Sequence, residues 1–381
     1  MVPALGTADI IGPLAGAKRI VVKIGSALLV NQESGQIRRD WLEALADDVA
    51  DLRKRGKEVL IVSSGAIAVG CRHLGLSGPE LKLEEKQAAA ATGQIRLAHA
   101  YEEVLARHDI TVAQVLLSPE DTERRRRHLN ARATMTTLLS LGAVPVINEN
   151  DTVATAEIRF GDNDRLGARV AQMVTADTLL LLSDVDGLYD QDPRKNPDAR
   201  HIVNVDRITP EIEAMAGAAG TDRASGGMVT KLAAARIATS AGCRMAIVAG
   251  EPLNPLASLE AGARCTWFQA SDTPRAARKN WIAGAISAAG AVYLDAGAER
   301  ALSSGRSLLP AGVTQVTGRF ERGDLITVHG VKGREIARGL AAYGAEDAAR
   351  IKGHKSREIE TILGYRGRDE LIHRDDLVLT R

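Results

Sequence analysis

Five short apolar runs, each followed by small or polar residues, constrain the fold of this 381-residue chain more than any other feature. The runs and the residues that follow them are 21–24 with Gly25-Ser26, 59–62 with Ser63-Ser64-Gly65, 144–147 with Asn148 to Asp151, 179–182 with Ser183-Asp184, and 246–248 with Ala249-Gly250. Continuous apolar runs of this length are typical of strands in a parallel sheet that helices cover on both faces. Such sheets bind ligands outside the carboxyl ends of their strands. The polar residues therefore predict a binding site at that edge.

The first 270 residues alternate between strand and helix patterns, which predicts an α/β fold. We expect a three-layer α/β/α sandwich with a mainly parallel sheet over 18–270. Further elements expected in it are a strand over 111–117 and helices over 40–55, from Ser64, over 83–107 and over 130–141.

The segments outside residues 18–270 differ from them in composition and in hydrophobic pattern. The polar stretch 271–289 is interpreted as a linker, and the short, glycine-punctuated segments of 290–368 predict a small β-rich domain shaped as a compact barrel. Residues 1–17 are expected to be an N-terminal extension and residues 369–381 a C-terminal tail.

Composition argues against several classes of function. The net charge of +1 gives no general attraction for nucleic acid or membranes, and an aromatic content of 3% disfavours a groove that stacks bases. No apolar run is long enough to span a bilayer, and the three cysteines form no C-x-x-C pair. We therefore expect a cytoplasmic protein with inert thiols.

Two lysines beside glycine turns are the candidates for binding phosphate, since neither common nucleotide fingerprint is present. Lys23 lies inside an apolar run, where an unpaired ammonium group is costly to bury. Lys231 ends the segment Ser225-Gly226-Gly227-Met228-Val229-Thr230-Lys231, which opens a helical pattern. The N–H groups at a helix start favour an anion. The alternatives are a lysine that reaches from the sheet edge to solvent and a flexible loop followed by a surface lysine.

The other polar clusters also have more than one interpretation. Ser64 could cap a helix or, with its neighbours, receive a carboxylate. The cluster from Asn148 to Asp151 could form a turn or bind the ammonium and amide-like groups of an amino acid. Within Gly161-Asp162-Asn163-Asp164 one residue could simply cap the helix that follows.

Two further segments are less specific. The stretch from Ser183 to Tyr189 fits a loop that holds a nucleotide's ribose or base, because its glycine comes too early for a calcium-binding loop. The run from Arg124 to Arg127 is interpreted as a solvated helix face.

Several of these motifs occur together and in a characteristic order. They are Lys23-Ile24-Gly25-Ser26, Ser63-Ser64-Gly65-Ala66-Ile67-Ala68, residues 145–151, Gly161-Asp162-Asn163-Asp164 and residues 226–231. As a set they resemble the amino acid kinase family and, within it, the glutamate 5-kinases. The segment 290–368 resembles the PUA domain that many bacterial members carry.

The resemblance implies an activity and a role for each matched residue. The activity is the ATP-dependent phosphorylation of the side-chain carboxylate of L-glutamate, the first step of proline biosynthesis. Lys23 and Lys231 would contact the transferring phosphoryl group, and Asp164 would hold the two lysines. Ser64, Asp151 and Asn163 would bind glutamate. Ser183, Asp184 and the segment Ser225 to Lys231 would line the ATP site, with Lys23 reaching the same phosphates.

The resemblance also bears on cofactors and partners. It implies Mg²⁺ that is held largely by the phosphates of ATP, with no dedicated protein ligands. It implies a homo-oligomer and glutamyl phosphate reductase as the acceptor of a labile product. Two alternatives remain: a kinase of the same family acting on another carboxylate or carbamate, such as acetylglutamate or aspartate, or an RNA-binding protein that uses the PUA domain.

Overall fold

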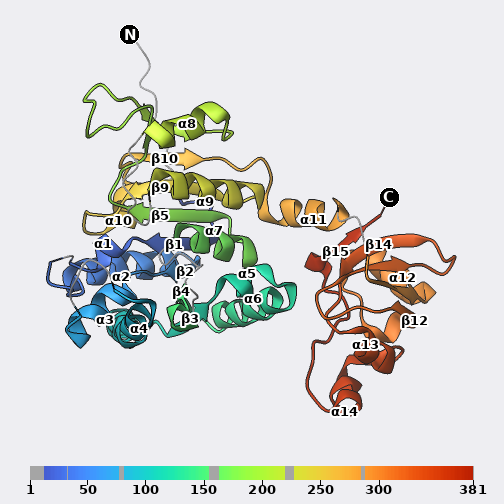
Figure 1. The fold of residues 1–381 in the computed structure, drawn as a ribbon. Coiled ribbons are helices and arrows are strands. Elements are labelled where there is room, and N and C mark those ends of the chain that lie inside the picture. Colours follow the sequence, from blue (N-terminus) through green and yellow to red (C-terminus); the bar gives the residue numbers. More distant parts are fainter. Residues whose placement is uncertain are drawn as a thin grey trace, which may run out of the picture. The chain divides into compact units, whose positions relative to one another are not determined.

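The computed structural model describes residues 13–31, 33–76, 81–153, 163–218, 227–284 and 288–380. The chain divides into two compact units (Figure 1). The first comprises Met1–Thr122 and Ala131–Thr273, and the second comprises Glu123–Asn130 and Pro274–Arg381.

The first unit is built on an eight-stranded sheet with the strand order β3-β4-β2-β1-β5-β9-β10-β8. The six neighbouring strands from β3 to β9 are parallel, and β10 runs antiparallel to β9. Their bounds are β1 Arg19–Ile24, β2 Glu58–Val62, β3 Val112–Leu117, β4 Val144–Glu149, β5 Thr178–Ser183, β8 Asn204–Val205, β9 Arg244–Ala249 and β10 Cys265–Phe268. The predicted strands and their parallel arrangement are confirmed.

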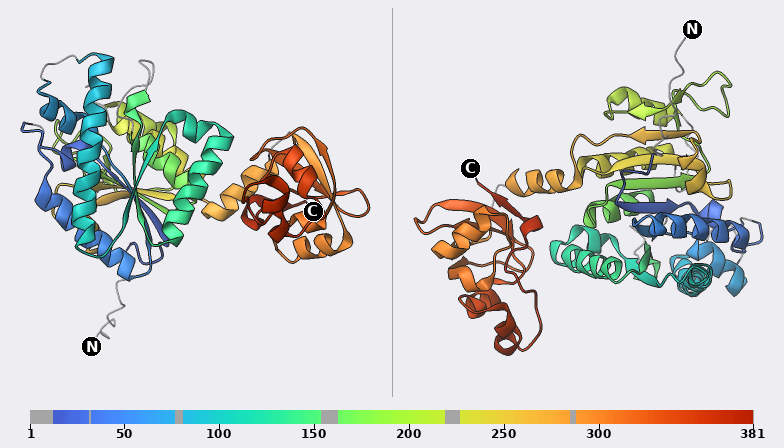
Figure 2. Two further views of the ribbon diagram at one scale, coloured as in Figure 1. Left: turned by 90° about the horizontal axis from the view of Figure 1, so that it is seen from below. Right: turned by 180° about the vertical axis from the view of Figure 1, so that it is seen from behind.

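Helices cover both faces of this sheet, as the left view of Figure 2 shows. The helices are α1 Ser26–Leu29, α2 Arg39–Lys54, α3 Ala66–Leu74, α4 Leu83–Ala106, α5 Pro119–Glu123, α6 Arg125–Ser140, α7 Asn163–Met173, α8 Pro210–Ala218, α9 Met228–Ser240 and α10 Pro255–Glu260. Ile20 and Val22 of β1 belong to the core formed with α2 and α4, whereas Val21 belongs to the core formed with α7 and α9. Alternate side chains of a strand point to opposite faces, so a sheet buried on both faces reads as a continuous apolar run. The three-layer prediction is confirmed.

After β1 the chain forms β2, which borders β1 along one edge. It later forms β5, which borders β1 along the opposite edge. The strand order therefore reverses between β1 and β5, and the crevice outside such a reversal is the usual ligand site of an open α/β sheet. Lys23 lies next to it, paired in register with Val62 of β2 and Leu181 of β5.

Helices α3 and α4 pack with almost no side chain between them. A Cβ atom added to Gly70 would lie 1.7 Å from the carbonyl oxygen of Ala89, and one added to Gly93 would lie 1.8 Å from that of Ala66. Only glycine allows the two backbones to approach so closely. Because α3 starts directly after the Ser63-Ser64-Gly65 cluster, this contact also fixes one wall of the predicted site.

The end of the predicted N-terminal extension is part of the first unit, so that boundary was wrong for residues 14–17. Leu14 is fully buried in the core, and Lys57 donates hydrogen bonds to the carbonyl oxygens of Leu14, Ala15 and Ala17 at 2.8–2.9 Å. A single lysine that satisfies three backbone acceptors gives no recognisable sequence signal.

The second unit contains a five-stranded sheet with the order β12-β11-β13-β14-β15. Its strands are β11 Gly290–Leu294, β12 Val313–Gly318, β13 Leu325–His329, β14 Glu335–Leu340 and β15 Leu377–Leu379, accompanied by α12 Ala296–Ser303, α13 Ala345–Ile351 and α14 Ile359–Leu363. The predicted β-rich domain is confirmed.

Two boundary interpretations around this unit need correction. The predicted tail 369–381 contains β15, which pairs with β14 and buries Leu377. Most of the predicted linker 271–289 is a helix, α11 (Pro274–Gly284). Proline at the first helical position and the alanines that follow are compatible with a helix, although the segment is polar.

Two expectations from composition concern membranes and thiols. Among the described residues, no helix combines the length and apolarity needed to cross a bilayer. Cys71, Cys243 and Cys265 are free, and burial raises the pKa of the Cys243 thiol, which keeps it neutral and unreactive.

The α3–α4 contact leads to a stability prediction. Gly93→Ala places a methyl group against backbone that cannot move aside, so the cost should reach or exceed the upper end of the roughly 1–3 kcal/mol typical of overpacking. Thermal unfolding should show a midpoint at least about 6 °C below that of the wild type. Gly217→Ala is the control, because a Cβ there meets nothing within 4 Å. Equal midpoints for the two variants would contradict the close approach.

Candidate active site

A buried carboxylate joins the two lysines that the sequence singled out. The Lys23 Nζ atom lies 2.6 Å from Asp164 Oδ1, and the Lys231 Nζ atom lies 3.3 Å from Asp164 Oδ2. The exposed fractions of the three residues are 7%, 4% and 2% for Lys23, Lys231 and Asp164. Neither lysine extends to solvent, so both surface alternatives are wrong.

Three separate elements supply these groups. Lys23 comes from β1, Asp164 from the first turn of α7, and Lys231 from the first turn of α9. Gly167 lets α7 lie close to β1, because a Cβ at that position would be 3.3 Å from the Cβ of Lys23. The fold thus brings together two lysines that are 208 positions apart in the chain (231 − 23).

The carboxyl group of Asp164 stays ionised because the two neighbouring lysines stabilise its negative charge. Burial acts to raise the pKa of Asp164, but Lys23 and Lys231 outweigh it and, with a hydrogen bond from Thr230, hold that pKa below its usual value. Two ammonium groups thus lie beside one buried carboxylate. Lysine side chains brought together in this way are suited to an anionic ligand.

Helix α9 adds backbone donors beside Lys231. Gly227 is its N-cap and makes no side-chain capping bond, while the Thr230 hydroxyl lies 3.0 Å from Asp164 Oδ2. The first N–H groups of a helix have no intrahelical acceptor and favour an anion. Met228 and Val229 lie in this first turn. The predicted ATP-site residues Ser225 and Gly226 lie outside the described residues.

A second, neutral cluster lies at the ends of β2 and β4. The Asn163 Nδ2 group donates to the carbonyl oxygen of Ser63 at 3.0 Å and to the Ser64 hydroxyl at 2.8 Å. It also lies 3.4 Å from Asn148 Oδ1. Asn163 and Asp164 are consecutive, so the first turn of α7 connects this amide cluster to the lysine pair.

The helix-cap interpretation of Ser64 was wrong. Helix α3 begins at Ala66, and its N-cap is Gly65 with a φ of 91°, a left-handed conformation that favours glycine. A Cβ on Gly65 would also lie 2.8 Å from Val30 Cγ2. The Ser64 hydroxyl accepts from Asn163 instead, which leaves its own proton available to a ligand.

Asp151 provides a negative group near this cluster. It begins the short 3₁₀ turn Asp151–Val153, directly after β4, and is buried. Burial raises the pKa of Asp151 to about 6. Among the described residues its carboxylate has no hydrogen-bond or ion-pair partner, which distinguishes it from the paired Asp164.

The end of β5 contributes the remaining predicted pair. Ser183 is the last residue of β5 and is buried, and its hydroxyl donates to Asp184 Oδ1 at 2.9 Å. Asp184 is exposed beyond the strand. Both lie at the same sheet edge as Lys23, since β1 and β5 are parallel neighbours.

Two residues of α4 were missed by sequence reasoning. Gln94 Oε1 accepts a hydrogen bond from Asn148 Nδ2 at 2.8 Å, and the Tyr101 hydroxyl lies 3.1 Å from Ser63 Oγ. Tyr101 fits the apolar pattern of the helix and Gln94 its polar pattern. Neither stands out until the sheet and helix are seen together.

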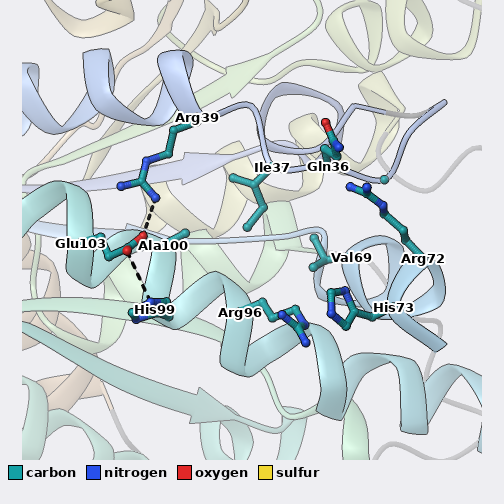
Figure 3. A pocket seen from close by; sticks show the side chains of 11 residues that line it. Gln36, Ile37, Arg39, Val69, Arg72, His73, Arg96, His99, Ala100 and Glu103 are labelled. Carbon is teal, nitrogen blue, oxygen red and sulfur yellow. Dashed lines mark hydrogen bonds and ion pairs between the residues drawn. The ribbon is translucent and has the colours of Figure 1, made fainter.

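A separate cavity of about 380 Å³ opens between α3, α4 and the segment that precedes α2 (Figure 3). Its lining includes Arg72, His73 and Arg96, and at one end Glu103 forms an ion pair with Arg39 and lies 3.5 Å from His99 Nε2. None of the predicted site residues lines it. We therefore place the candidate active site at the sheet edge.

Comparison with family models decides the classification. A model described as "Amino acid kinase family" matches residues 18–249, which is more than half of the chain, and one described as "PUA domain" matches residues 290–363. The chain belongs to the amino acid kinase family.

The relatives of this amino acid kinase extend over almost its whole length. A glutamate 5-kinase of Paramagnetospirillum magneticum is 67% identical and covers 96% of this chain and 99% of its own. A glutamate 5-kinase of Agrobacterium fabrum is 61% identical, over 97% of this chain and 94% of its own. Among solved structures, the carbamate kinase from Giardia lamblia bound to AMP-PNP is 18% identical with a TM-score of 0.47, covering 67% of this chain and 99% of that chain.

The charge cluster of this kinase leads to a prediction about Asp164. Asp164→Asn removes the carboxylate between two buried ammonium groups, and breaking a buried pair typically costs about 3–5 kcal/mol. Urea unfolding should show a loss of that size. Sulfate should restore more stability to the variant than to the wild type, because an oxyanion can take the place of the carboxylate.

Asp51→Asn serves as the control, since among the described residues the Asp51 side chain forms only an exposed i,i+4 ion pair with Arg55. Its loss should stay below about 1 kcal/mol. An Asp164→Asn variant as stable as this control would show that the lysine pair does not depend on Asp164.

Proposed function

We propose that this protein is a glutamate 5-kinase, which transfers the γ-phosphoryl group of ATP to the side-chain carboxylate of L-glutamate. The product is L-glutamyl 5-phosphate, and the reaction is the first step of proline biosynthesis. The observation that carries the proposal is the first turn of α7, where Asn163 faces the amide cluster and Asp164 holds the two lysines. An amino-acid subsite and a phosphoryl subsite therefore adjoin.

The lysine pair forms the phosphoryl subsite. Lys23 and Lys231 bring two ammonium groups, held by Asp164, to the place where the γ-phosphate arrives. They reduce the repulsion between the carboxylate and the polyphosphate. Phosphoryl transfer needs little beyond such charge stabilisation and alignment of the reacting atoms.

The amide cluster forms the glutamate subsite. The Ser64 hydroxyl can donate to a carboxylate, and Asp151 offers a negative charge to the α-ammonium group. Asn163 contributes its carbonyl oxygen, because its NH₂ group is used by Ser63 and Ser64. The substrate carboxylate thus meets a hydrogen-bond donor, and the substrate ammonium group meets a negative charge and an acceptor oxygen.

The chemical step needs no general base. The attacking oxygen belongs to the side-chain carboxylate of glutamate, whose ordinary pKa of about 4.3 leaves it ionised at neutral pH. A bond forms between this oxygen and the γ-phosphorus as the bond to the β–γ bridging oxygen breaks. ADP leaves with that electron pair.

ATP would lie across the carboxyl ends of β1 and β5. Ser183 and Asp184 line its nucleoside side, and the segment Ser225 to Lys231 lies at its phosphates. Among the described residues, no group of three His, Cys, Asp or Glu side chains could hold a metal alone. When bound with ATP, Mg²⁺ would supply further neutralisation of the phosphate charge, as it does in many kinases.

The product suggests the next partner. An acyl phosphate hydrolyses readily in water, so an enzyme that reduces it, glutamyl phosphate reductase, would act promptly. We also propose that the protein assembles as a homo-oligomer.

A hydroxamate assay tests the substrate. Hydroxylamine traps an acyl phosphate as a hydroxamate, which forms a coloured complex with ferric iron, and glutamate should give an ATP-dependent signal. N-acetylglutamate and aspartate should give little. A preference for either of them would assign the enzyme to another branch of its family.

The lysine pair should control turnover. Lys23→Ala and Lys231→Ala should each lower kcat about 10²–10³-fold, the usual loss for one group that stabilises charge in the transition state. The KM for ATP should change less. Lys231→Arg should restore little, because a planar guanidinium does not replace a compact ammonium group. Near-normal kcat in either alanine variant would remove that lysine from the mechanism.

Asp151 should make glutamate use depend on pH. Its carboxylate is protonated below its pKa of about 6 and charged above it, and the substrate ammonium group binds the charged form. The kcat/KM for glutamate should therefore rise as pH increases through about 6. Asp151→Asn should lower kcat/KM and flatten this part of the profile. A profile with the same inflection in the variant would assign the titration to another group.

A further inference from the structure

The orientation of two amide side chains in the glutamate subsite is fixed by the backbone. Asn163 must present its NH₂ group to the carbonyl oxygen of Ser63, which can only accept. Asn148 must present Oδ1 to the N–H group of Glu149, which can only donate, at 2.9 Å. Rotating the Asn163 amide by 180° would place its oxygen against the Ser63 carbonyl oxygen. Rotating the Asn148 amide would place its NH₂ group against the Glu149 N–H group.

This constraint determines what Asn148 requires on its other side. Its NH₂ group points away from the Glu149 N–H, toward α4, where Gln94 Oε1 accepts at 2.8 Å. Asn148 is almost fully buried, so losing this acceptor would leave a buried donor unsatisfied. Gln94 therefore holds the Asn148 side chain in place, and Asn148 Oδ1 lies 3.4 Å from Asn163 Nδ2.

One group of the network has no partner among the described residues. Asn163 Oδ1 is buried without a hydrogen-bond donor. Its NH₂ group is used by Ser63 and Ser64, so Oδ1 faces the remaining side of the amide. A buried carbonyl oxygen in this position is matched by an ammonium group, which only donates.

We propose that Gln94 is a positioning residue that sets the selectivity of the enzyme for a substrate with an α-ammonium group. It holds the Asn148 side chain in place beside Asn163, whose Oδ1 accepts that group. The inference rests on the proposed function, because the subsite is taken to bind glutamate.

Helix α4 is a rigid support for this role. Gly93, the residue before Gln94, packs against the backbone of Ala66 with no room for a side chain. On the same helix, the buried Tyr101 hydroxyl lies 3.1 Å from Ser63 Oγ. The position of Gln94 relative to the ends of β2 and β4 is thus set by backbone contact.

The test compares glutamate with glutarate, which has the same two carboxylates and no ammonium group. Gln94→Met keeps the approximate length and volume of the side chain but removes the acceptor oxygen. Gln94→Glu keeps an acceptor at that position. For each variant, the KM for glutamate, the inhibition constant of glutarate, the KM for ATP and the thermal midpoint are measured.

The expected result is a loss of selectivity in one variant only. Gln94→Met should raise the KM for glutamate about tenfold and leave glutarate inhibition, the KM for ATP and kcat within about twofold. A lost hydrogen bond that strands a buried donor has an effect of this order. Gln94→Glu should stay within about threefold of the wild type for both ligands.

Two results would overturn the inference. Equal weakening of glutamate and glutarate in Gln94→Met would show a merely structural role, and unchanged glutamate binding would show no role. Should the Met variant not fold, Gln94→Ala removes the acceptor without adding volume. Failure of the proposed function is recognised separately, because the wild type would then give no hydroxamate from glutamate.

Discussion

The carboxylate of Asp164 between Lys23 and Lys231 is the interaction on which the site depends. Three buried charges are costly, and they persist only because each lies within a few ångströms of its opposite. In the proposed function the same two ammonium groups would also receive the transferring phosphoryl group.

The position of that carboxylate in the chain determines where the amide cluster lies relative to the two lysines. Asp164 follows Asn163, and the first turn of α7 directs one residue to the lysines and the other to the amide cluster. The two subsites therefore cannot move apart without unwinding α7. In a reaction that relies on alignment rather than on a base, this rigid spacing contributes directly to the rate.

Much of this organisation could be predicted from the sequence, and the reasons for the failures are physical. Uninterrupted apolar strands are a strong signal, and the polar residues after them located the sheet edge. Lys23 was found because it lies inside an apolar run, and Lys231 because it follows a glycine-rich helix start. The helix-cap interpretation of Ser64 failed because a left-handed Gly65 took that position, and the boundaries failed where Leu14 and Leu377 join a core from outside a regular pattern. Gln94 could not be found, since its importance comes from a hydrogen bond across 54 positions of chain.

The two subsites use different physical means, which allows selectivity and turnover to be separated. Lysine ammonium groups act nearly as point charges, so the proposed phosphoryl subsite would depend mainly on the placement of charge. Amide groups have a donor side and an acceptor side, so the proposed glutamate subsite would set its selectivity through hydrogen-bond direction. Backbone groups at Ser63 and Glu149 set that direction, and α4 holds it from outside the pocket. Changes in α4 should therefore alter which acid is accepted, while changes around Asp164 should alter how fast any acid reacts.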